Sequence, residues 1–593
     1  MRATFLILAF VVTAAAGELR ADPTTEAIKN PAASSWPSFG RGYDNQRFSP
    51  LKQIDSSNVQ RLATAWTYRS GVKATFQATP VVVDRTMYLS LPYNHVVALD
   101  ARTGKELWRY THRLKPDRKL CCGPSNRGVA VANGKVFMGT VDGRLISLDQ
   151  RSGEKLWDID VLESSPTATE SLAAIDASDP LAKARFVGST GAGIAMAPVV
   201  YEGKVLIGIT GVGFGLHLDA SAENPLTVVG VAGNYGRSGF LAAYDVDTGQ
   251  RLWKFDTVLA GAWEGSYRDR TPDGLPLPRD IPGEKAMAAK YPDAWKFGGG
   301  SAWSTPAIDP QRGLLYFGTG NPSPNMEDSS RPGDNLYTTS LVALEIATGK
   351  RRWHYQQVPH DIWGYDVASP AVLFDFERDG KRTPAVAQAS KLGWLYIHDR
   401  ETGELLLKSD AFVPQQNMFM RPSSEGTRIS PGVIGGVNWS PMALDQTAGL
   451  AYVAAIHWPV IYRLHDKPAG EGKQGVRYTT MDPALDERWG VLAAIDLKTG
   501  RLRWQHRTRE PLIGGALATA GNLVFVGEGS GEFDAFDAAS GALLWQSKHD
   551  AGVNAPPITY AVDGVQYLAV VIGGNQLFGF PQGDQVAVFA LGK

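Results

Sequence analysis

Short runs of apolar residues, each followed by an acidic residue, a polar turn and a tryptophan, recur along the whole chain. The clearest copy, residues 97–108, reads Val-Ala-Leu-Asp-Ala-Arg-Thr-Gly-Lys-Glu-Leu-Trp. Each copy predicts a β-hairpin, because Asp and Thr-Gly favour a tight turn in which Gly takes a positive φ. The turn glycines are Gly104, Gly153, Gly249, Gly349, Gly403, Gly500 and Gly541, and Trp stands four residues after each of them except at Leu407.

An eighth unit is marked only by Trp66, which ends an apolar run beginning at Leu62 and looks like the strand of a copy whose turn has been lost. Runs between the copies, such as residues 135–139 and 522–527, supply further strands. One such sheet cannot bury both of its faces alone, whereas several sheets stacked radially can. The sequence therefore predicts an all-β fold, an eight-bladed β-propeller with tryptophan-docking repeats.

Three long insertions interrupt the repeat, at about residues 211–231, 267–296 and 466–487. Long loops on a rigid scaffold commonly carry binding sites or control the access of substrates. The same segments could equally be inert additions, and the sequence leaves both interpretations open.

The first residues have the pattern of a secretory signal peptide, which we place at residues 1–21. Arg2 precedes a largely apolar run, residues 3–16, that is too short to span a bilayer, and small residues follow. Cleavage after Ala16 or Ala21 fits this pattern. No later segment has the roughly 18 or more apolar residues of a membrane helix, so we expect an exported protein without a membrane span.

Charge and composition narrow the possible partners. The 593 residues carry a formal net charge of −1, which gives no electrostatic reason to expect binding to nucleic acid or to a membrane surface. The 64 glycines and 36 prolines fit a β protein rich in turns.

The two cysteines of the sequence, Cys121 and Cys122, are adjacent. A disulfide between neighbours closes almost no loop, so it adds little stability by constraining the unfolded chain. If oxidised, the pair forms a small strained ring, and strain of that kind tends to mark a functional site. The alternative is a pair of small buried apolar side chains.

The tandem Asp-x-x-Thr-Gly-x-x-x-Trp units, the signal peptide and the cysteine pair followed by Asn-Arg-Gly at 126–128 resemble the quinoprotein alcohol dehydrogenases. Members of that family are periplasmic eight-bladed propellers that bind pyrroloquinoline quinone (PQQ) and a metal ion. The resemblance covers about residues 35–593, which would form the PQQ-binding domain.

The resemblance implies cofactor contacts for several residues. A disulfide between Cys121 and Cys122 would pack on one face of the quinone, and Trp303 would stack on the other. Arg127 would pair with a carboxylate of PQQ, as a bidentate guanidinium does well. A cation at Lys391 would stabilise the negative charge of the reduced quinone. The further contacts that the resemblance implies are Ser301, Asn438 and the backbone at Gly515.

The resemblance also implies a metal site. Asn321, in Gly-Thr-Gly-Asn-Pro, matches an amide ligand suited to a hard cation such as calcium. The active-site run of the family reads His-Asp-x-Trp-Asp-Tyr, whereas residues 360–366 read His-Asp-Ile-Trp-Gly-Tyr-Asp. Gly364 therefore replaces the usual catalytic Asp. Asp366 matches the extra metal-binding Asp of the members that use lanthanides.

One acid thus remains at the expected metal and catalytic centre. Residues two apart in an extended segment point to the same side, so Asp366 is our candidate for the base, a metal ligand or both. The metal-binding Glu of the family is replaced by Asn234 in one alignment and by Gly213 in another. Fewer negative ligands should weaken the affinity for a metal. The sequence does not decide between calcium and a lanthanide.

We therefore expect a periplasmic, PQQ-dependent dehydrogenase that oxidises an alcohol by hydride transfer to metal-polarised PQQ, with Asp366 as the proton acceptor. Both cysteines lie in the adjacent pair, so no covalent c-type haem is expected, and electrons would pass to an external acceptor such as a cytochrome c. One alternative is the same cofactor acting on a bulky secondary alcohol, a polyol or a sugar. The other is a non-catalytic propeller scaffold.

Overall fold

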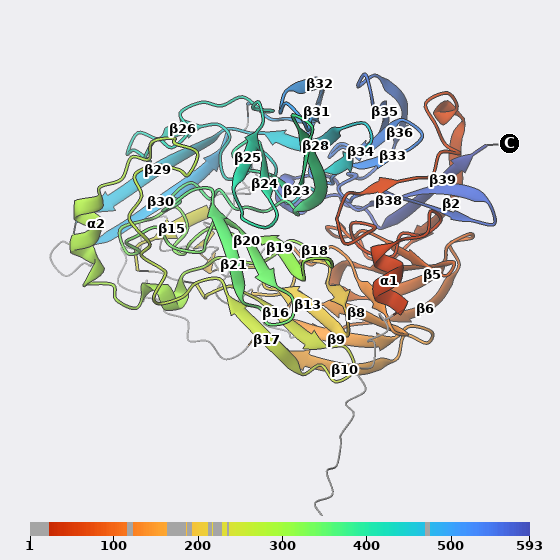
Figure 1. Ribbon diagram of the computed structural model, residues 1–593, viewed down its shortest axis with the longest axis horizontal. Helices are drawn as coiled ribbons and strands as arrows, with labels where there is room; N and C mark the ends of the chain where they lie inside the picture. Colours follow the sequence, from red (N-terminus) through yellow and green to blue (C-terminus); the bar gives the residue numbers. More distant parts are fainter. Residues whose placement is uncertain are drawn as a thin grey trace, which may run out of the picture.

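The structure is a computed structural model of the chain (Figure 1). It describes residues 23–114, 123–162, 185–186, 192–211, 216–217, 228–233, 236–468, 475–484 and 486–592. The expected signal peptide and the candidate residues Cys121, Cys122 and Asn234 lie outside the described residues.

Eight small sheets form the blades of a propeller, which we number 1 to 8. Blades 1 to 4 are β3 (Val81–Val83), β4 (Thr86–Ser90), β5 (Val96–Asp100), β6 (Glu106–Tyr110); β7 (Ala130–Ala132), β8 (Lys135–Gly139), β9 (Arg144–Asp149), β10 (Lys155–Asp160); β12 (Val199–Tyr201), β13 (Lys204–Gly208), β16 (Phe240–Asp245), β17 (Arg251–Asp256); and β18 (Ala307–Asp309), β19 (Leu314–Gly318), β20 (Ser340–Glu345), β21 (Arg351–Gln356). Blades 5 to 8 are β22 (Val372–Arg378), β23 (Lys381–Ala389), β24 (Leu395–Asp399), β25 (Leu405–Lys408); β27 (Ala443–Asp445), β28 (Leu450–His457), β31 (Trp489–Asp496), β32 (Leu502–Thr508); β33 (Leu517–Thr519), β34 (Leu523–Gly527), β35 (Glu532–Asp537), β36 (Leu543–Lys548); and β37 (Ile558–Val562), β38 (Val565–Ile572), β39 (Gln585–Leu591), β2 (Leu62–Arg69). The predicted eight-bladed propeller is confirmed.

Blade 8 is completed by a strand from the other end of the chain. Strand β2 pairs antiparallel with β39, and Trp66 of β2 lies opposite Val588. The eighth unit therefore has no turn before its tryptophan because the chain enters this strand from the N-terminal segment. Pairing of the first long strand with the last closes the ring.

Each repeat glycine packs against the tryptophan of the preceding blade. Gly153 has a φ of +75°, and a Cβ atom at that position would lie 2.5 Å from the ring of Trp108. The indole N–H of Trp108 donates a hydrogen bond to the backbone oxygen of Gln150 in the next blade, at 3.1 Å. The same packing of a turn glycine against a tryptophan ring joins Gly104 to Trp66, Gly249 to Trp157, Gly349 to Trp253, Gly403 to Trp353 and Gly541 to Trp504. Gly500 packs against Leu407 instead. The fixed Gly-to-Trp spacing thus holds neighbouring blades together.

The N-terminal segment, residues 36–49, joins the inner strands of the blades to one another. Its backbone oxygens accept hydrogen bonds from four of these strands: Tyr43 from Ile308, Asp44 from Leu373, Gln46 from Leu444 and Arg47 from Ala518. Its last residues form β1 (Phe48–Ser49), which pairs parallel with β33. The buried guanidinium of Arg47 donates to the backbone oxygens of Phe39, Ala516 and Pro557, and burial lowers the pKa of Arg47 to about 9.

A ninth sheet stands outside the ring and is built in part from two of the insertions, residues 211–231 and 466–487. It contains β11 (Arg185–Phe186), β14 (Leu216–His217), β15 (Val228–Val231), β30 (Val476–Pro483), β29 (Val460–Lys467) and β26 (Thr427–Ile429), in that order. In Figure 1, β29 and β30 lie beside α2 (Ile281–Ala288), far from α1 (Pro23–Lys29). The short 3₁₀ helices are η1 (Val59–Arg61), η2 (Pro92–Asn94), η5 (Ala294–Phe297) and η6 (Gln576–Phe578). None of the helices in the described ranges is long and apolar enough to cross a membrane.

Candidate functional site

A cavity lies at the end of the propeller where loops enter the innermost strand of each blade or leave its second strand. The space between its walls measures about 1010 Å³, including its opening to solvent. Each blade contributes to the wall, for example through Gln77, Arg127, Thr210, Ser301, Asp366, Asn438, Ile513 and Asn575 of blades 1 to 8 in turn.

Most of the described candidate residues come together at this cavity. Those that line it are Arg127, Ser301, Trp303, Asn321, Asp366, Lys391 and Asn438. Gly515 does not line it: a Cβ at Gly515, whose φ is +89°, would lie 2.5 Å from Pro441, and its neighbour Ile513 forms the wall instead. Residues from four blades that were singled out separately in the sequence therefore face one space.

Arg127 and two tryptophans form one polar and aromatic part of the wall. The guanidinium carbon of Arg127 lies 5.0 Å from the ring centre of Trp303 and 4.5 Å from that of Trp439. Its Nη1 atom donates to the backbone oxygen of Trp303 at 3.1 Å. The arrangement offers a cation and flat aromatic surfaces to the same ligand.

Asp366 is held by two donors, and one of them is a lysine. Its Oδ2 atom accepts a hydrogen bond from Nζ of Lys391 at 2.6 Å, and its Oδ1 atom accepts one from the backbone N–H of Asn321 at 2.5 Å. The Nζ atom of Lys391 also donates to the backbone oxygen of Gly364 at 3.1 Å. Asp366 and Lys391 are 8% and 3% exposed, so this ion pair is largely shielded from solvent, which strengthens the attraction between its charges.

The turn before Asp366 is fixed by a second, fully buried acid. The carboxylate of Asp361 accepts hydrogen bonds from the backbone N–H groups of Trp363, Gly364 and Tyr365 at 3.0–3.1 Å. Burial raises the pKa of Asp361 to about 6, although these hydrogen bonds oppose the rise. Gly364 has a φ of +81°, and a Cβ there would lie 2.5 Å from Val433. The backbone of this turn therefore requires glycine at position 364.

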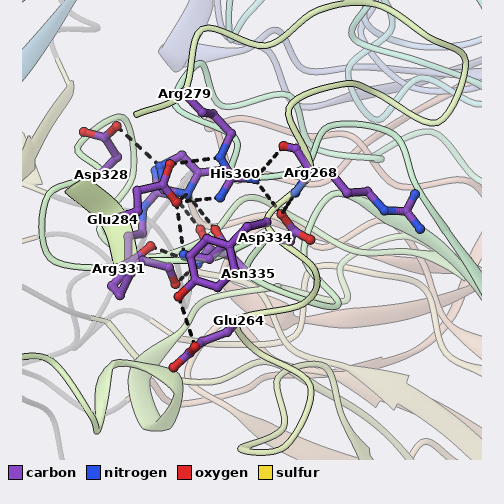
Figure 2. Close-up of polar contacts among 12 residues, drawn as sticks. Glu264, Arg268, Arg279, Glu284, Asp328, Arg331, Asp334, Asn335 and His360 are labelled. Atoms are coloured by element: carbon purple, nitrogen blue, oxygen red, sulfur yellow. Dashed lines mark hydrogen bonds and ion pairs between the residues drawn. The ribbon is translucent and has the colours of Figure 1, made fainter. Parts of the chain in front are cut away.

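A buried network connects this turn to one of the insertions (Figure 2). Glu284 of helix α2 accepts two hydrogen bonds from Arg279, at 2.9 and 2.5 Å, and its Oε2 atom lies 3.5 Å from Nδ1 of His360. Arg279 also donates to Asp334 at 2.5 Å. The insertion at residues 267–296 is thus packed onto the residues that precede the Asp361 turn and braces them.

Two further contacts complete this network. Nη2 of Arg331 donates to the backbone oxygen of Asp361 at 2.6 Å, and the Nε2 atom of His360 lies 3.4 Å from Oδ2 of Asp328. Burial alone would raise the pKa of Asp328, but His360, Arg421 and Arg331 hold it well below its usual range. The positive and negative side chains of this network therefore compensate one another. The contacts of Arg331 and His360 hold the loop that carries Asp366 in place.

Two of the three residues expected to bind a metal, Asn321 and Asp366, lie together, but they do not fit a resident metal ion. Both oxygens of Asp366 already accept hydrogen bonds, one of them from an ammonium group. Asn321 supplies one neutral side chain, whose Nδ2 atom donates to the backbone oxygen of Pro322 at 2.9 Å. Across the described ranges, no three His, Cys, Asp or Glu residues gather as a metal site. Calcium takes about six to eight oxygen ligands, with carboxylates prominent among them.

Another part of the cavity wall is apolar. Its residues come from the loop before blade 6, from the ninth sheet, from the loop before blade 7 and from η6: Val433, Ile434, Met481, Ile513, Leu577 and Phe578. They belong to one hydrophobic cluster, which also includes Trp439 and packs against Trp303. Met481 stands on β30, within the insertion at residues 466–487, so that insertion reaches the cavity.

Sequence reasoning missed several lining residues. Trp439 directly follows the predicted Asn438 and lies outside the Gly-x-x-x-Trp spacing, a signal that could have identified it. Gln77 and Asn575 carry no motif and become neighbours of the site only when blades 8 and 1 close the ring. The apolar residues likewise have no distinguishing pattern.

Comparison with known proteins gives a consistent set of relatives. The family model described as "PQQ: Glucose/ethanol/alcohol dehydrogenase, beta-propeller domain" matches residues 36–417 and 408–568. The quinoprotein alcohol dehydrogenase PedH of Pseudomonas putida is 33% identical over 564 residues, covering 90% of this chain and 85% of that protein. The solved quinohemoprotein alcohol dehydrogenase ADHIIG of Pseudomonas putida has a TM-score of 0.76 at 31% identity, covering 96% of this chain and 82% of that one. A solved europium-containing methanol dehydrogenase has a TM-score of 0.75 at 28% identity, covering 96% and 100%.

Proposed function

Because the chain belongs to the PQQ-dependent glucose/ethanol/alcohol dehydrogenase family and is an enzyme of that family, we propose that it binds PQQ in this cavity and oxidises an alcohol there to an aldehyde or ketone. The matches to alcohol dehydrogenases over most of their length also argue against the non-catalytic scaffold. The observation that carries the proposal is the convergence of the candidate residues of four blades on one cavity.

The cavity wall suits a planar quinone that carries several carboxylates. Arg127 and Lys391 offer positive charge, and a guanidinium binds a carboxylate with two parallel hydrogen bonds. Trp303 and Trp439 provide flat apolar surfaces on which a conjugated ring system can stack. The amide of Asn438 adds a donor and an acceptor at the same wall. These residues would hold and orient PQQ.

The chemistry of the protein then lies in Asp366 and Lys391. When bound, PQQ would supply the oxidant, which takes a hydride from the alcohol carbon. A carboxylate has about four lone-pair sites, and two of those of Asp366 accept the hydrogen bonds described above, so it can still accept the proton of the alcohol hydroxyl. The ammonium group of Lys391 would stabilise negative charge on an oxygen of the bound quinone as it is reduced. Loss of that proton and that hydride converts the alcohol into a carbonyl compound.

The apolar part of the wall bears on the choice of substrate. An alcohol with an aliphatic or aromatic side chain would bury that group against Met481, Leu577 and Phe578, and burial of apolar surface is favourable. A polyol or a sugar would leave its extra hydroxyl groups without hydrogen-bond partners against the same surface, which is costly. We therefore favour apolar alcohols over polyols and sugars.

Features of the sequence support a proposal for the place of action and for the electron acceptor. The signal-like residues 1–21 favour export to the periplasm. The two cysteines are adjacent, which leaves no Cys-x-x-Cys-His motif for a covalent haem, so electrons would leave to a separate acceptor such as a cytochrome c.

A combined binding and activity assay tests the proposal. PQQ is titrated into the purified protein while tryptophan fluorescence is followed, and dye-linked turnover is then measured with ethanol, 1-octanol, benzyl alcohol, glycerol and glucose. We expect saturable quenching, and kcat/KM values for 1-octanol and benzyl alcohol at least about tenfold above those for glycerol and glucose, since burying one apolar side chain contributes ~1.5–3 kcal/mol. If neither quenching nor turnover is observed, the PQQ proposal is refuted. If glucose is turned over faster than 1-octanol and benzyl alcohol, only the proposed substrate class is refuted.

A further inference from the structure

We propose that the ammonium group of Lys391 takes the place that the resemblance gives to a metal ion, so that this chain binds and uses PQQ without a resident metal. The inference rests on the proposed PQQ chemistry and concerns only which cation serves it. It starts from the misfit between the donor residues and a metal ion, and from the contacts that Lys391 makes instead.

Lys391 is placed as a ligand-facing cation and not as a surface lysine. It is 3% exposed and lines the cavity. Its Nζ atom is bound by two oxygens, Oδ2 of Asp366 at 2.6 Å and the backbone oxygen of Gly364 at 3.1 Å. An ammonium group has three N–H donors, so one remains for a ligand in the cavity. The ammonium group of Lys391 can therefore contact Asp366 and a ligand in the cavity at the same time.

Gly364 contributes to this arrangement through its backbone. Where the family has an acidic side chain, this chain has glycine at a φ of +81°, with Val433 filling the space that a Cβ would need. The backbone carbonyl oxygen of Gly364 accepts hydrogen bonds from Lys391 and, at 3.0 Å, from the backbone N–H of Asp366. The backbone at Gly364 thus helps to hold the ammonium group at a position that has no acidic side chain.

The charges at the site favour the same conclusion. The charged residues of the described wall are Arg127, Lys391 and Asp366, which leaves one net positive charge. The resemblance expects acids at two positions, and this chain has Gly364 at one of them and Asn234 or Gly213, depending on the alignment, at the other; none of these residues is charged. A metal ion at Asp366 would have to share one carboxylate with an ammonium group in a shielded cavity, where repulsion between like charges is strong.

An ammonium group can do the electrostatic work that the resemblance assigns to the metal. A positive charge fixed next to an oxygen stabilises negative charge that develops on it during the reaction. Lys391 supplies that charge together with an N–H donor, and Asp366 and Gly364 hold it in place. Lys391 is therefore a cation of the chain itself, fixed beside Asp366 in the cavity wall.

Equilibrium PQQ binding with and without metal ions tests the inference. The purified protein is treated with EGTA and a lanthanide chelator, its metal content is checked by mass spectrometry, and the Kd for PQQ is measured by tryptophan quenching in chelator, in Ca²⁺ and in La³⁺. We expect the three Kd values to agree within about threefold, a difference of less than ~1 kcal/mol. A wild-type Kd that rises about tenfold or more in chelator and recovers with either ion would overturn the inference.

Lysine variants provide the second arm of this experiment. Lys391→Ala should weaken PQQ binding about tenfold or more in chelator, since charge-assisted hydrogen bonds are worth ~1.5–3 kcal/mol. It should also respond to Ca²⁺ or La³⁺, because Asp366 is then free to bind an ion. The matched control is Lys381→Ala, at the exposed other end of β23. If Lys391→Ala does not fold, the wild-type comparison still decides. If PQQ binds the wild type under none of the three conditions, the proposed function fails instead.

Discussion

The Nζ atom of Lys391 lies 2.6 Å from Oδ2 of Asp366, although the two residues are 25 positions apart in the chain. Asp366 precedes β22 and Lys391 follows β23, and these strands pair antiparallel with Val372 opposite Ala387. The loop that enters β22 and the loop that leaves β23 therefore emerge at the same end of blade 5. The fold of one blade thus places the candidate base and its neighbouring cation together.

Substitution of Arg127 should weaken the binding of PQQ more than it slows the chemical step. Arg127→Ala removes a charged hydrogen-bond donor from the wall. A hydrogen bond to a charged group contributes ~1.5–3 kcal/mol, so we expect the Kd for PQQ to rise by roughly 10- to 100-fold. Arg127→Lys keeps the charge but not the planar arrangement of donors, and its Kd for PQQ should lie between those of the wild type and Arg127→Ala. Fluorescence titration measures all three proteins, with exposed Arg378→Ala as control. An unchanged Kd in Arg127→Ala would remove Arg127 from the binding site.

Leu577 should affect the binding of long alcohols and leave short ones nearly unchanged. It is partly buried at the end of the cavity wall, in η6. With a long substrate such as octanol, Leu577→Ser should raise KM by roughly tenfold or more, and with ethanol it should change KM little, because the lost apolar contact is worth ~1.5–3 kcal/mol only to a ligand that reaches it. The matched control is Leu543→Ser on exposed β36, where the leucine is 44% exposed. Equal effects on both alcohols would show that this residue does not select the substrate.

The blade architecture could be predicted because the repeat encodes the contact between blades. The spacing from Gly153 to Trp157, and its equivalents, fixes both the hairpin turn and the position of the tryptophan that the next blade covers. The polar half of the site could be predicted as well, since Arg127, Trp303 and Asp366 stand in recognisable local motifs.

The remainder of the site depends on contacts that no local pattern records. Met481 reaches the cavity because β30 joins a sheet assembled from segments far apart in the chain. The ion pair of Lys391 with Asp366 depends on the pairing of β22 with β23. The role of Gly364 appears only when its φ and its contact with Val433 are known, because a glycine in the sequence signals only the loss of an acid.

The tryptophan-docking contact should be measurable as thermal stability. Gly349→Ala forces a side chain onto a residue with a φ of +71°, at a distance of 2.6 Å from Trp253. Gly564→Ala imposes a similar backbone cost at a φ of +77°, with no atom within 4 Å of the new Cβ. The difference between the two variants therefore isolates the docking contact. We expect Gly349→Ala to lose ~1–3 kcal/mol more, as overpacking of a core does, and to have the lower Tm by scanning fluorimetry. Equal Tm values would mean that the glycine is needed for the turn alone.

Asp361 should make the stability of the fold depend on pH between about 4 and 6. Burial raises the pKa of this carboxyl from 3.8 to about 6, so the folded state binds its proton more tightly than the unfolded state does. This contribution is complete below pH 3.8 and is lost as the pH rises through 6, a change of ~3 kcal/mol in the free energy of unfolding. Asp361→Asn cannot titrate and should lack it.

The difference in Tm between the wild type and Asp361→Asn therefore shifts in favour of the variant as the pH rises from about 4 to about 7. The exposed Asp379→Asn should run parallel to the wild type over the same range. A constant difference between Asp361→Asn and the wild type would show that Asp361 is ionised throughout in the folded protein.

The most direct test of the account is the reduction of protein-bound PQQ by 1-octanol in a single turnover, followed by absorbance with no electron acceptor present. The wild type should reduce its bound PQQ. Asp366→Asn should bind PQQ and reduce it roughly 10²- to 10⁴-fold more slowly, because it lacks the acceptor for the hydroxyl proton. The exposed Asp379→Asn should behave as the wild type. Bound PQQ that stays oxidised in the wild type, or is reduced equally fast in Asp366→Asn, would contradict the assignment of this cavity and its acid as the site of alcohol oxidation.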